Sequence, residues 1–250
     1  NIIKRAVKKF LISGASIYFS TSDKTTEYLI HYGAKKENIV RYRFSSLYKN
    51  DIIPTILNKD EKQLLRSKYN LTEKRIVLAV GQFIYRKGFD VLLKAAMRLS
   101  NEIGIYFVGG EATEEYLNIK KMYNLNNVHF VGFQTKEVLK EYYQAADLFV
   151  LPTREDIWGL VINEAMANGL PIITTINCVS GLDLVEEGIN GYLVPVDDDE
   201  TLAERINTVL EHDNIIVKMG NNSLKKIRKY TIEDMAMTHM KIFEKYKIID

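Results

Sequence analysis

Short apolar runs alternate with amphipathic stretches along most of the 250 residues. Between the apolar runs, hydrophobic side chains recur at steps of three and four residues, as Phe89, Leu92, Leu93 and Ala96 do, which predicts helices with one buried face. The apolar runs are typical of strands buried on both faces of a parallel sheet. This alternation predicts an α/β fold, a Rossmann-like parallel sheet with helices on both faces. The predicted strands cover residues 16–20, 39–44, 75–80, 104–108, 128–131, 148–151, 171–174 and 192–194, and the clearest helices cover 89–99, 138–145 and 201–210.

Segment 49–71 is predicted to be a linker, because it contains Pro54 and many charges around one short helix at 59–68. Before it, residues 1–48 have a helix-strand-helix-strand pattern. After it, residues 72–230 form a complete α/β domain, and a final helix occupies 231–250.

The composition excludes several classes of protein. Hydrophobic residues make up 46% of the chain and charged residues 26%, with a formal net charge of +2, so we expect a soluble globular protein without a nucleic-acid partner. The single cysteine, Cys178, fits a reducing compartment. No apolar run approaches the roughly 18 residues of a membrane helix, and no secretory signal is visible. We expect a cytoplasmic location, with peripheral contact at the inner face of the membrane as an alternative. The chain starts without Met, so we expect a piece of a longer protein.

The loop Gly81–Gly88 follows one predicted strand and precedes a helix at Phe89. Ligands of open parallel sheets bind beyond the carboxyl ends of the strands, where this loop lies. Arg86 and Lys87 place two cations beside a helix N-terminus, which suits a diphosphate, although an exposed basic loop is the alternative. The segment lacks the Gly-Lys-Ser/Thr ending of a P-loop, and no Gly-x-Gly-x-x-Gly is present, which disfavours an NAD enzyme. A second strand ends at Gly109-Gly110, for which a plain turn is the simpler interpretation.

A third strand runs into a loop and then a helix that starts near Gly159 and ends at Asn168-Gly169. The first amides of this helix have no intrahelical partner and can receive an anion. Asp156 precedes the helix and Glu164 lies about one turn inside it, so their carboxylates can accept the neighbouring hydroxyls of a ribose or hexose. The alternative is that both acids only stabilise the helix start. We expect both at a solvent-reachable cleft, and we assign the acidic run 197–199 to the start of another helix rather than to a metal site.

Segment Asp156–Glu164 resembles the Glu-x7-Glu signature of retaining GT-B glycosyltransferases of family 4, glycosyl transferases group 1. The following Ala-Met-Ala-Asn-Gly-Leu-Pro is similar to that family's continuation, and Gly81–Gly88 is similar to its Gly-Arg-x-x-x-x-Lys-Gly loop. The likeness covers nearly the whole chain. Two departures are Asp156 in place of the first glutamate, with Glu155 as a rival acid, and Gln82 in place of an arginine.

The resemblance implies transfer of a sugar from a nucleoside diphosphate sugar to an acceptor hydroxyl, with retention of anomeric configuration, in bacterial cell-surface polysaccharide or glycolipid synthesis. It implies that this chain is the C-terminal, donor-binding half and is inactive alone. Residues 1–48 would end the N-terminal acceptor domain, and the helix over 231–250 would cross back onto it. The expected partners are the donor and, through the absent domain, an acceptor sugar or glycolipid. Any membrane contact would also be through that domain.

The implied catalytic residues are Arg86, Lys87 and Asp156. Asp156 would hold the donor hexose and Glu164 the ribose, with no metal and no cofactor. Two alternatives stay open, a nucleotide-sugar-binding module without transferase activity and a sugar-nucleotide epimerase. The base, sugar, acceptor, linkage and oligomeric state are not determined by the sequence. The implied donor-binding residues are Gly81, Gln82, Phe133, Glu155, Trp158, Gly159, Leu160, Val161 and Glu164.

Overall fold

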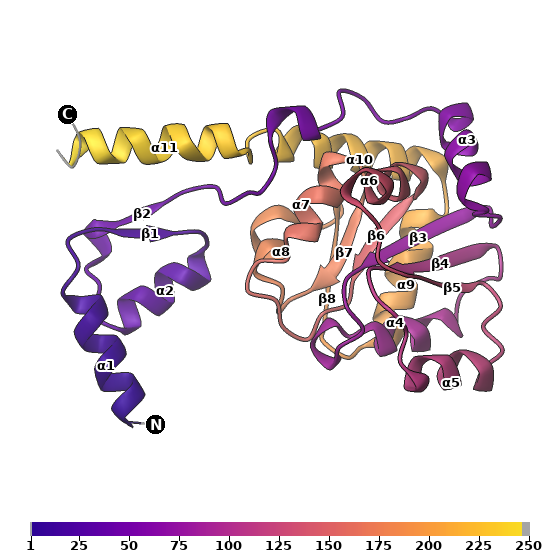
Figure 1. Ribbon diagram of the computed structural model, residues 1–250, viewed down its shortest axis with the longest axis horizontal. Helices are drawn as coiled ribbons and strands as arrows, with labels where there is room; N and C mark the ends of the chain where they lie inside the picture. The colour runs from indigo at the N-terminus through magenta and orange to yellow at the C-terminus, as the bar shows by residue number, and fades with distance from the viewer. Residues whose placement is uncertain (1, 247–250) are drawn as a thin grey trace. The chain divides into compact units, whose positions relative to one another are not determined.

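The computed structural model describes residues 2–246 and divides into two compact units (Figure 1). The smaller combines Asn1–Lys49 with Lys229–Asp250, and the larger is Asn50–Arg228. The final predicted helix therefore groups with the N-terminal segment, although more than 180 residues of the printed sequence separate them.

The smaller unit contains a short parallel pair of strands. In chain order it comprises α1 (Ile2–Ser13), β1 (Tyr18–Ser20), α2 (Asp23–His31), η1 (Lys36–Asn38), β2 (Ile39–Arg41) and α11 (Ile232–Lys245). The ring of Phe19 in β1 stacks on His239 of α11 at a centroid distance of 4.6 Å, which explains why the last helix belongs to this unit.

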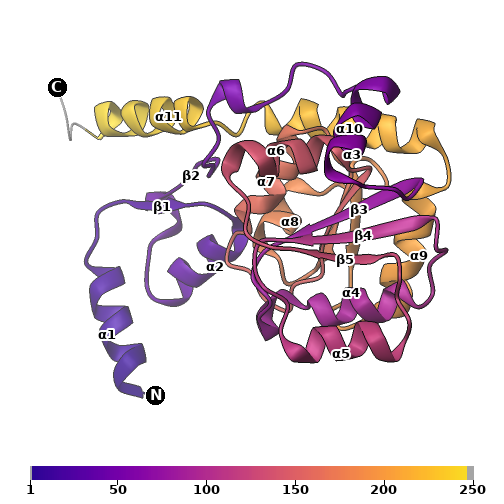
Figure 2. The same cartoon turned by 45° about the vertical axis from the view of Figure 1, so that its right-hand side comes forward.

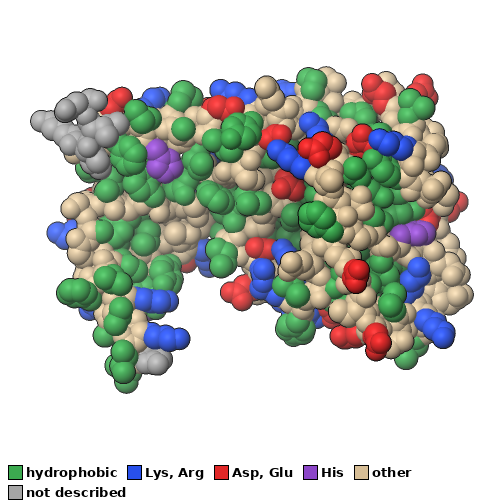
Figure 3. Space-filling model, in the orientation of Figure 1, with side chains coloured by type: hydrophobic (Ala, Val, Ile, Leu, Met, Phe, Trp, Pro, Cys, Tyr) green, Lys and Arg blue, Asp and Glu red, His purple; other side chains and the backbone are tan. Residues whose placement is uncertain are grey.

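Helix α1 carries large apolar side chains that are exposed to solvent, and hydrophobic atoms gather along it in the space-filling view (Figure 3). They include Ile2, Ile3, Val7, Phe10 and Leu11. Within residues 2–246, no helix combines the length and apolar character needed to cross a membrane.

The larger unit is built on a six-stranded, all-parallel sheet in the order β5-β4-β3-β6-β7-β8 (Figure 1). Val77 of β3 lies opposite both Ile105 and Leu148, so β3 is central. The predicted α/β fold is confirmed, and each of these strands lies within one residue of its predicted bounds. The strands are β3 (Arg75–Val80), β4 (Ile103–Val108), β5 (Val128–Val131), β6 (Leu148–Leu151), β7 (Ile172–Thr175) and β8 (Gly191–Val194).

Helices cover both faces of this sheet (Figures 1 and 2). One face packs on α4, α5 and α9 through a continuous apolar core that includes Val77, Phe89 and Ile206. The opposite face packs on α6 and α7. The helices are η2 (Lys49–Asp51), α3 (Lys59–Tyr69), η3 (Tyr85–Lys87), α4 (Phe89–Ala96), α5 (Glu114–Met122), α6 (Lys136–Ala145), α7 (Leu160–Ala167), α8 (Val179–Leu184), α9 (Asp199–Leu210) and α10 (Asp213–Ile227).

Most of the segment predicted as a linker, residues 49–71, groups instead with the larger unit. Its helix α3 packs against α6 through cationic side chains as well as through the rings of Tyr69 and Tyr142, whose centroids lie 4.7 Å apart. Arg66 donates from Nε to the carbonyl of Ala145 at 2.9 Å, and Lys62 donates from Nζ to Ala146 at 2.6 Å. The high charge that suggests an exposed linker is used here to satisfy carbonyls at the end of a neighbouring helix.

Candidate functional site

The direction in which the strands are added to the sheet reverses between β3 and β6. From β3 the chain continues to β4 and β5 on one side, whereas from β6 it continues to β7 and β8 on the other. Ligands of open α/β sheets bind where the strand order reverses in this way. The loop after β3 and the loop after β6 therefore lie beside each other, as their predicted ligand role requires.

Glycine brings the two loops into contact. Gly88 has a φ of +66°, and a Cβ on it would lie 2.0 Å from the carbonyl oxygen of Pro152, so only glycine fits. At the other end of the loop, Gly81 donates its N–H to Val108 at 2.9 Å, and a Cβ on Gly109 would be 3.0 Å from the Gly81 oxygen. The loops that follow β3, β4 and β6, which were predicted from the sequence, therefore meet at one edge of the sheet.

Hydrogen bonds fix the loop after β6 to the loop after β3. The carbonyl of Arg86 accepts from the Arg154 N–H and from the Thr153 hydroxyl, both at 2.8 Å. Arg154 binds both carboxylate oxygens of Asp90 in α4, at 2.9 and 2.7 Å, and its guanidinium lies 3.9 Å from the Tyr85 ring centroid. Sequence reasoning missed Thr153 and Arg154, because neither stands out from an ordinary loop residue.

The predicted cations meet the predicted acid. Lys87 donates from Nζ to Asp156 Oδ2 at 2.6 Å, and an Arg86 terminal nitrogen lies 3.6 Å from Asp156 Oδ1. Arg86 also donates to the main-chain carbonyl of Glu155 at 2.9 Å, while the Glu155 side chain belongs to an exposed residue. Of the two rival acids, Asp156 is therefore the one whose carboxylate contacts both cations.

The expectation that Asp156 lies at a solvent-reachable position is wrong, since only 8% of the residue is exposed. Its main chain forms a parallel bridge with Cys178, in which the Asp156 N–H donates to Asn177 and its carbonyl accepts from Val179. This bridge holds the carboxylate inside the loop, where Lys87 compensates its charge.

Helix α7 starts at Gly159, whose φ of +78° is left-handed. A Cβ there would be 3.2 Å from Cys178 Sγ and 3.3 Å from Ser180 Oγ, so the helix start lies close to the segment after β7. No side chain caps it, and the amides of Leu160 and Val161 belong to the first turn, which has no intrahelical acceptors. This arrangement can receive an anion.

The indole of Trp158, predicted to contact the donor, is buried and donates from Nε1 to Asn163 Oδ1 at 3.0 Å. It thus stabilises the start of α7 from inside. Whether Trp158 also contacts a ligand stays a prediction.

Glu164 lies in the second turn of α7 and is partly buried. Tyr143 of α6 donates its hydroxyl to Glu164 Oε2 at 3.0 Å. Burial raises the pKa of Glu164 and raises the pKa of Tyr143 well above its ordinary value, so the tyrosine stays a neutral donor. Sequence reasoning missed Tyr143, because a tyrosine on the inner face of a helix is indistinguishable from a core residue.

Two other predicted donor-binding residues, Gln82 and Phe133, are exposed. Gln82 is exposed and lies beside the glycine turn, since a Cβ on Gly110 would be 3.8 Å from its Cα. Phe133 follows β5 and is 82% exposed. Strands β4 and β3 separate β5 from β6, a span of about 14 Å at ordinary strand spacing. Phe133 therefore follows a strand that is not next to β6, and its role stays a prediction.

The acidic run after β8 starts a helix, as predicted. Asp198 caps α9 by accepting from the Thr201 N–H at 2.9 Å, and Asp199 pairs with Arg98 at 3.1 Å. In the described part of the chain, no group of three or more His, Cys, Asp or Glu side chains is arranged to hold a metal ion. Metal independence stays a prediction.

Residues 61–226 match the family model of glycosyl transferases group 1. The chain belongs to this family. One curated relative is the N,N'-diacetylbacillosaminyl-diphospho-undecaprenol alpha-1,3-N-acetylgalactosaminyltransferase of Campylobacter jejuni, 21% identical over 91% of this chain and 60% of the relative. Another is the mannosylfructose-phosphate synthase of Agrobacterium fabrum, 29% identical over 67% of this chain and 39% of the relative.

Two solved structures have the same fold as this chain. Sucrose-phosphate synthase from Thermosynechococcus elongatus superimposes with a TM-score of 0.83 at 26% identity, covering 99% of this chain and 62% of that one. HepE from Anabaena, solved with UDP and glucose, superimposes with a TM-score of 0.82 at 20% identity, covering 100% of this chain and 68% of that one. The chain spans about 60% of the length of the first relatives that it matches.

Proposed function

We propose that this group 1 glycosyltransferase moves a sugar from a nucleoside diphosphate sugar to an acceptor hydroxyl with retention of configuration, as a member of family 4. The chain would supply the donor-binding half. The observation that carries the proposal is the pairing of Lys87 and Arg86 with Asp156, beside the uncapped start of α7, at the reversal point of the sheet.

The chemistry required of such a site is stabilisation of a leaving diphosphate. As the glycosidic bond breaks, negative charge accumulates on the phosphate oxygens. Cations and helix amides that are already in place lower the barrier, because they interact more strongly with that charge than with the intact donor. Arg86, Lys87 and the first amides of α7 would have this role, which needs no divalent metal.

The two acids would bind the sugars of the donor. Asp156 would accept hydroxyls of the hexose while orienting Lys87 toward the diphosphate. Glu164 would accept the ribose diol, since Tyr143 donates to only one of its two carboxylate oxygens. Gly81, Gln82, Phe133, Glu155 and Trp158 would complete the donor contacts.

UDP is the nucleotide we propose, and the presence of UDP in HepE supports it. We also propose that residues 1–48 belong to the acceptor-binding part of the whole protein, that the acceptor is a bacterial surface polysaccharide or glycolipid, and that the protein works in the cytoplasm, at most peripherally attached to the membrane. The N-acetylgalactosaminyltransferase of Campylobacter jejuni, whose name includes a lipid diphosphate, supports a glycolipid acceptor.

Calorimetry with UDP, GDP, uridine and NAD tests the proposal. We expect UDP to bind with higher affinity than uridine, since the cations contact only the diphosphate. Absence of binding by every nucleoside diphosphate at millimolar concentration would contradict it. For a longer form that transfers sugar, NMR of the product's anomeric proton tests retention, and UDP binding without any turnover would favour a binding module.

A further inference from the structure

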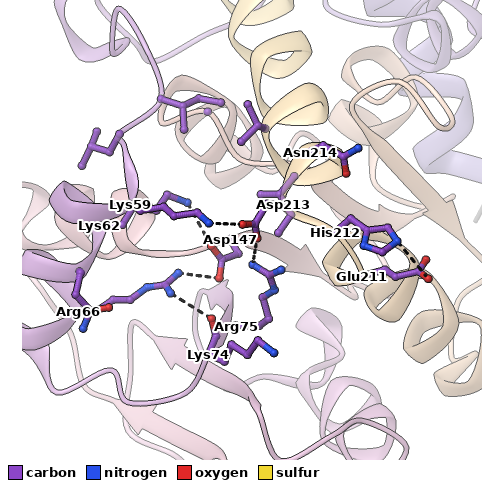
Figure 4. A pocket seen from close by; sticks show the side chains of 16 residues that line it. Lys59, Lys62, Arg66, Lys74, Arg75, Asp147, Glu211, His212, Asp213 and Asn214 are labelled. Atoms are coloured by element: carbon purple, nitrogen blue, oxygen red, sulfur yellow. Dashed lines mark hydrogen bonds and ion pairs between the residues drawn. The ribbon is translucent and has the colours of Figure 1, made fainter.

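A hollow of about 900 Å³ lies at the opposite, amino edge of the six-stranded sheet. Arg75, the first residue of β3, and Asp147, which immediately precedes β6, both line it (Figure 4). Strand β3 runs from this hollow to the Gly81 loop, a span of about 17–20 Å for six residues. The hollow is therefore separate from the candidate donor site.

One carboxylate in the wall, that of Asp147, forms ion pairs with two cations. The Asp147 side chain, which is 7% exposed, lies 2.7 Å from Arg66 and 3.4 Å from Lys62, and it also accepts from the Ile76 N–H at 2.9 Å. When Lys62 is protonated, these three side chains together carry one net positive charge.

A second carboxylate in the wall is shared in the same way. Asp213, at the start of α10, lies 2.6 Å from both Lys59 and Arg75 (Figure 4). The bonds with Lys59 and Arg75 lower the pKa of Asp213 to about 2, so this acid is ionised at neutral pH. This group also has a net charge of +1, and Figure 4 shows both groups pointing toward the same space.

The positive charge around the hollow is not fully compensated. Burial lowers the pKa of Lys62, and the neighbouring Arg66 and Arg75 lower it further, although Asp147 opposes them. Helix α10 is 15 residues long and begins at the hollow, and its N-cap His212 provides no side-chain cap, so its dipole adds to the field. The remaining acid of the lining, Glu211, is beside His212 at 3.6 Å, and both side chains are mostly exposed.

Part of the remaining wall is apolar, and Gln63, Lys74 and Asn214 also line the hollow. Ile56, Leu57, Ile216 and Val217 line the hollow next to the cations. Its volume is in the range of small-molecule sites, which combine apolar walls with a few converging polar groups.

We propose that this hollow binds a phosphate-bearing organic anion, with the phosphate between Lys59, Lys62 and Arg75 and the organic group against the apolar wall. A phosphate would supply the negative charge that the two shared carboxylates do not, and arginine and lysine are the side chains that bind it best. A soluble phosphate ester and the headgroup of an anionic lipid have this chemistry in common.

The test is calorimetry on the full 250-residue chain with n-hexyl phosphate and with inorganic phosphate, at low ionic strength. Lys59→Gln should weaken n-hexyl phosphate binding by about tenfold or more, because one charge-assisted contact is lost. Lys59 is 86% exposed, so this variant should fold normally. The matched control is Lys68→Gln, which removes the same charge from the same helix but does not line the hollow and should change affinity by less than about twofold.

Three further results distinguish the outcomes. NMR shifts on adding n-hexyl phosphate should centre on Ile216 and Val217, and Arg86→Ala should leave this binding unchanged while weakening UDP. Vesicles of phosphatidylcholine with phosphatidic acid identify the source of the phosphate. If the protein sediments with the vesicles and Lys59→Gln abolishes this, the ligand is a lipid headgroup. If the protein binds n-hexyl phosphate but not the vesicles, the ligand is a soluble ester. The proposal is overturned if neither probe binds, if the shifts map elsewhere, or if the Lys59 and Lys68 variants behave alike.

Discussion

Removing the Lys87 ammonium should have two separable effects, on stability and on diphosphate binding. The Lys87 and Asp156 side chains are 14% and 10% exposed, and Nζ lies 2.6 Å from Oδ2. Lys87→Ala leaves a buried carboxylate with only Arg86, whose nitrogen is 3.6 Å away. Loss of one partner of a buried pair costs about 3–5 kcal/mol. Because Arg86 remains, we expect a loss of about 2–3 kcal/mol in the free energy of unfolding.

A double-mutant cycle separates these effects. Asp156→Asn combined with Lys87→Ala removes the uncompensated charge, so the double variant should be more stable than Lys87→Ala alone by about 1–2 kcal/mol. In both Lys87→Ala and the double variant, the free energy of UDP binding should be less favourable than in the unchanged chain by about 1.5–3 kcal/mol. Uridine should bind to both variants as it does to the unchanged chain. The measurements are urea unfolding and calorimetry on the same four proteins.

Two results would refute this reasoning. Equal stability of Lys87→Ala and the double variant would mean that the buried charge costs nothing in the absence of its partner. Equal loss of UDP and uridine affinity would mean that Lys87 does not contact the diphosphate.

Three other predictions follow from the site. Burial raises the pKa of Glu164, so UDP affinity should fall with decreasing pH already above the range where an ordinary glutamate titrates. Calorimetry on Glu164→Gln should show weaker UDP binding without this pH dependence. Gly88→Ala should lower the free energy of unfolding by more than about 3 kcal/mol, because its Cβ would meet the Pro152 oxygen at 2.0 Å, and Gly132→Ala, which meets nothing within 4 Å, is the control for the unfolding measurement. UDP affinity should be the same with and without excess EDTA, and binding that is lost with EDTA and restored by magnesium would contradict a cation-only site.

Periodicity was sufficient for the strands of the large sheet, because β3, β4, β6 and β7 are apolar runs buried on both faces and the edge strands β5 and β8 are also mostly apolar. The loop motifs also predicted correctly that Gly81–Gly88 and the start of α7 share one edge, since parallel strands place their carboxyl ends together. What could not be predicted were contacts between side chains far apart in sequence. The Tyr143–Glu164 bond joins two helices, and Asp147 joins α3 to two strands. The charges of segment 49–71 predicted an exposed segment. Nothing in the local sequence shows that Lys62 and Arg66 bind a buried acid and the carbonyls at the end of α6.

The placement of β3 has a consequence for how the chain folds during synthesis. Its first partner, β4, follows soon after it, but its other partner, β6, emerges from the ribosome roughly seventy residues later than β3 itself. Until then one edge of an almost entirely apolar strand has unpaired backbone groups. Such an edge can pair with another chain, so nascent molecules of this protein should be most prone to aggregation while residues between β4 and β6 are being translated. Once β6 docks, both edges of β3 are paired, so the strand no longer offers a free edge to another chain.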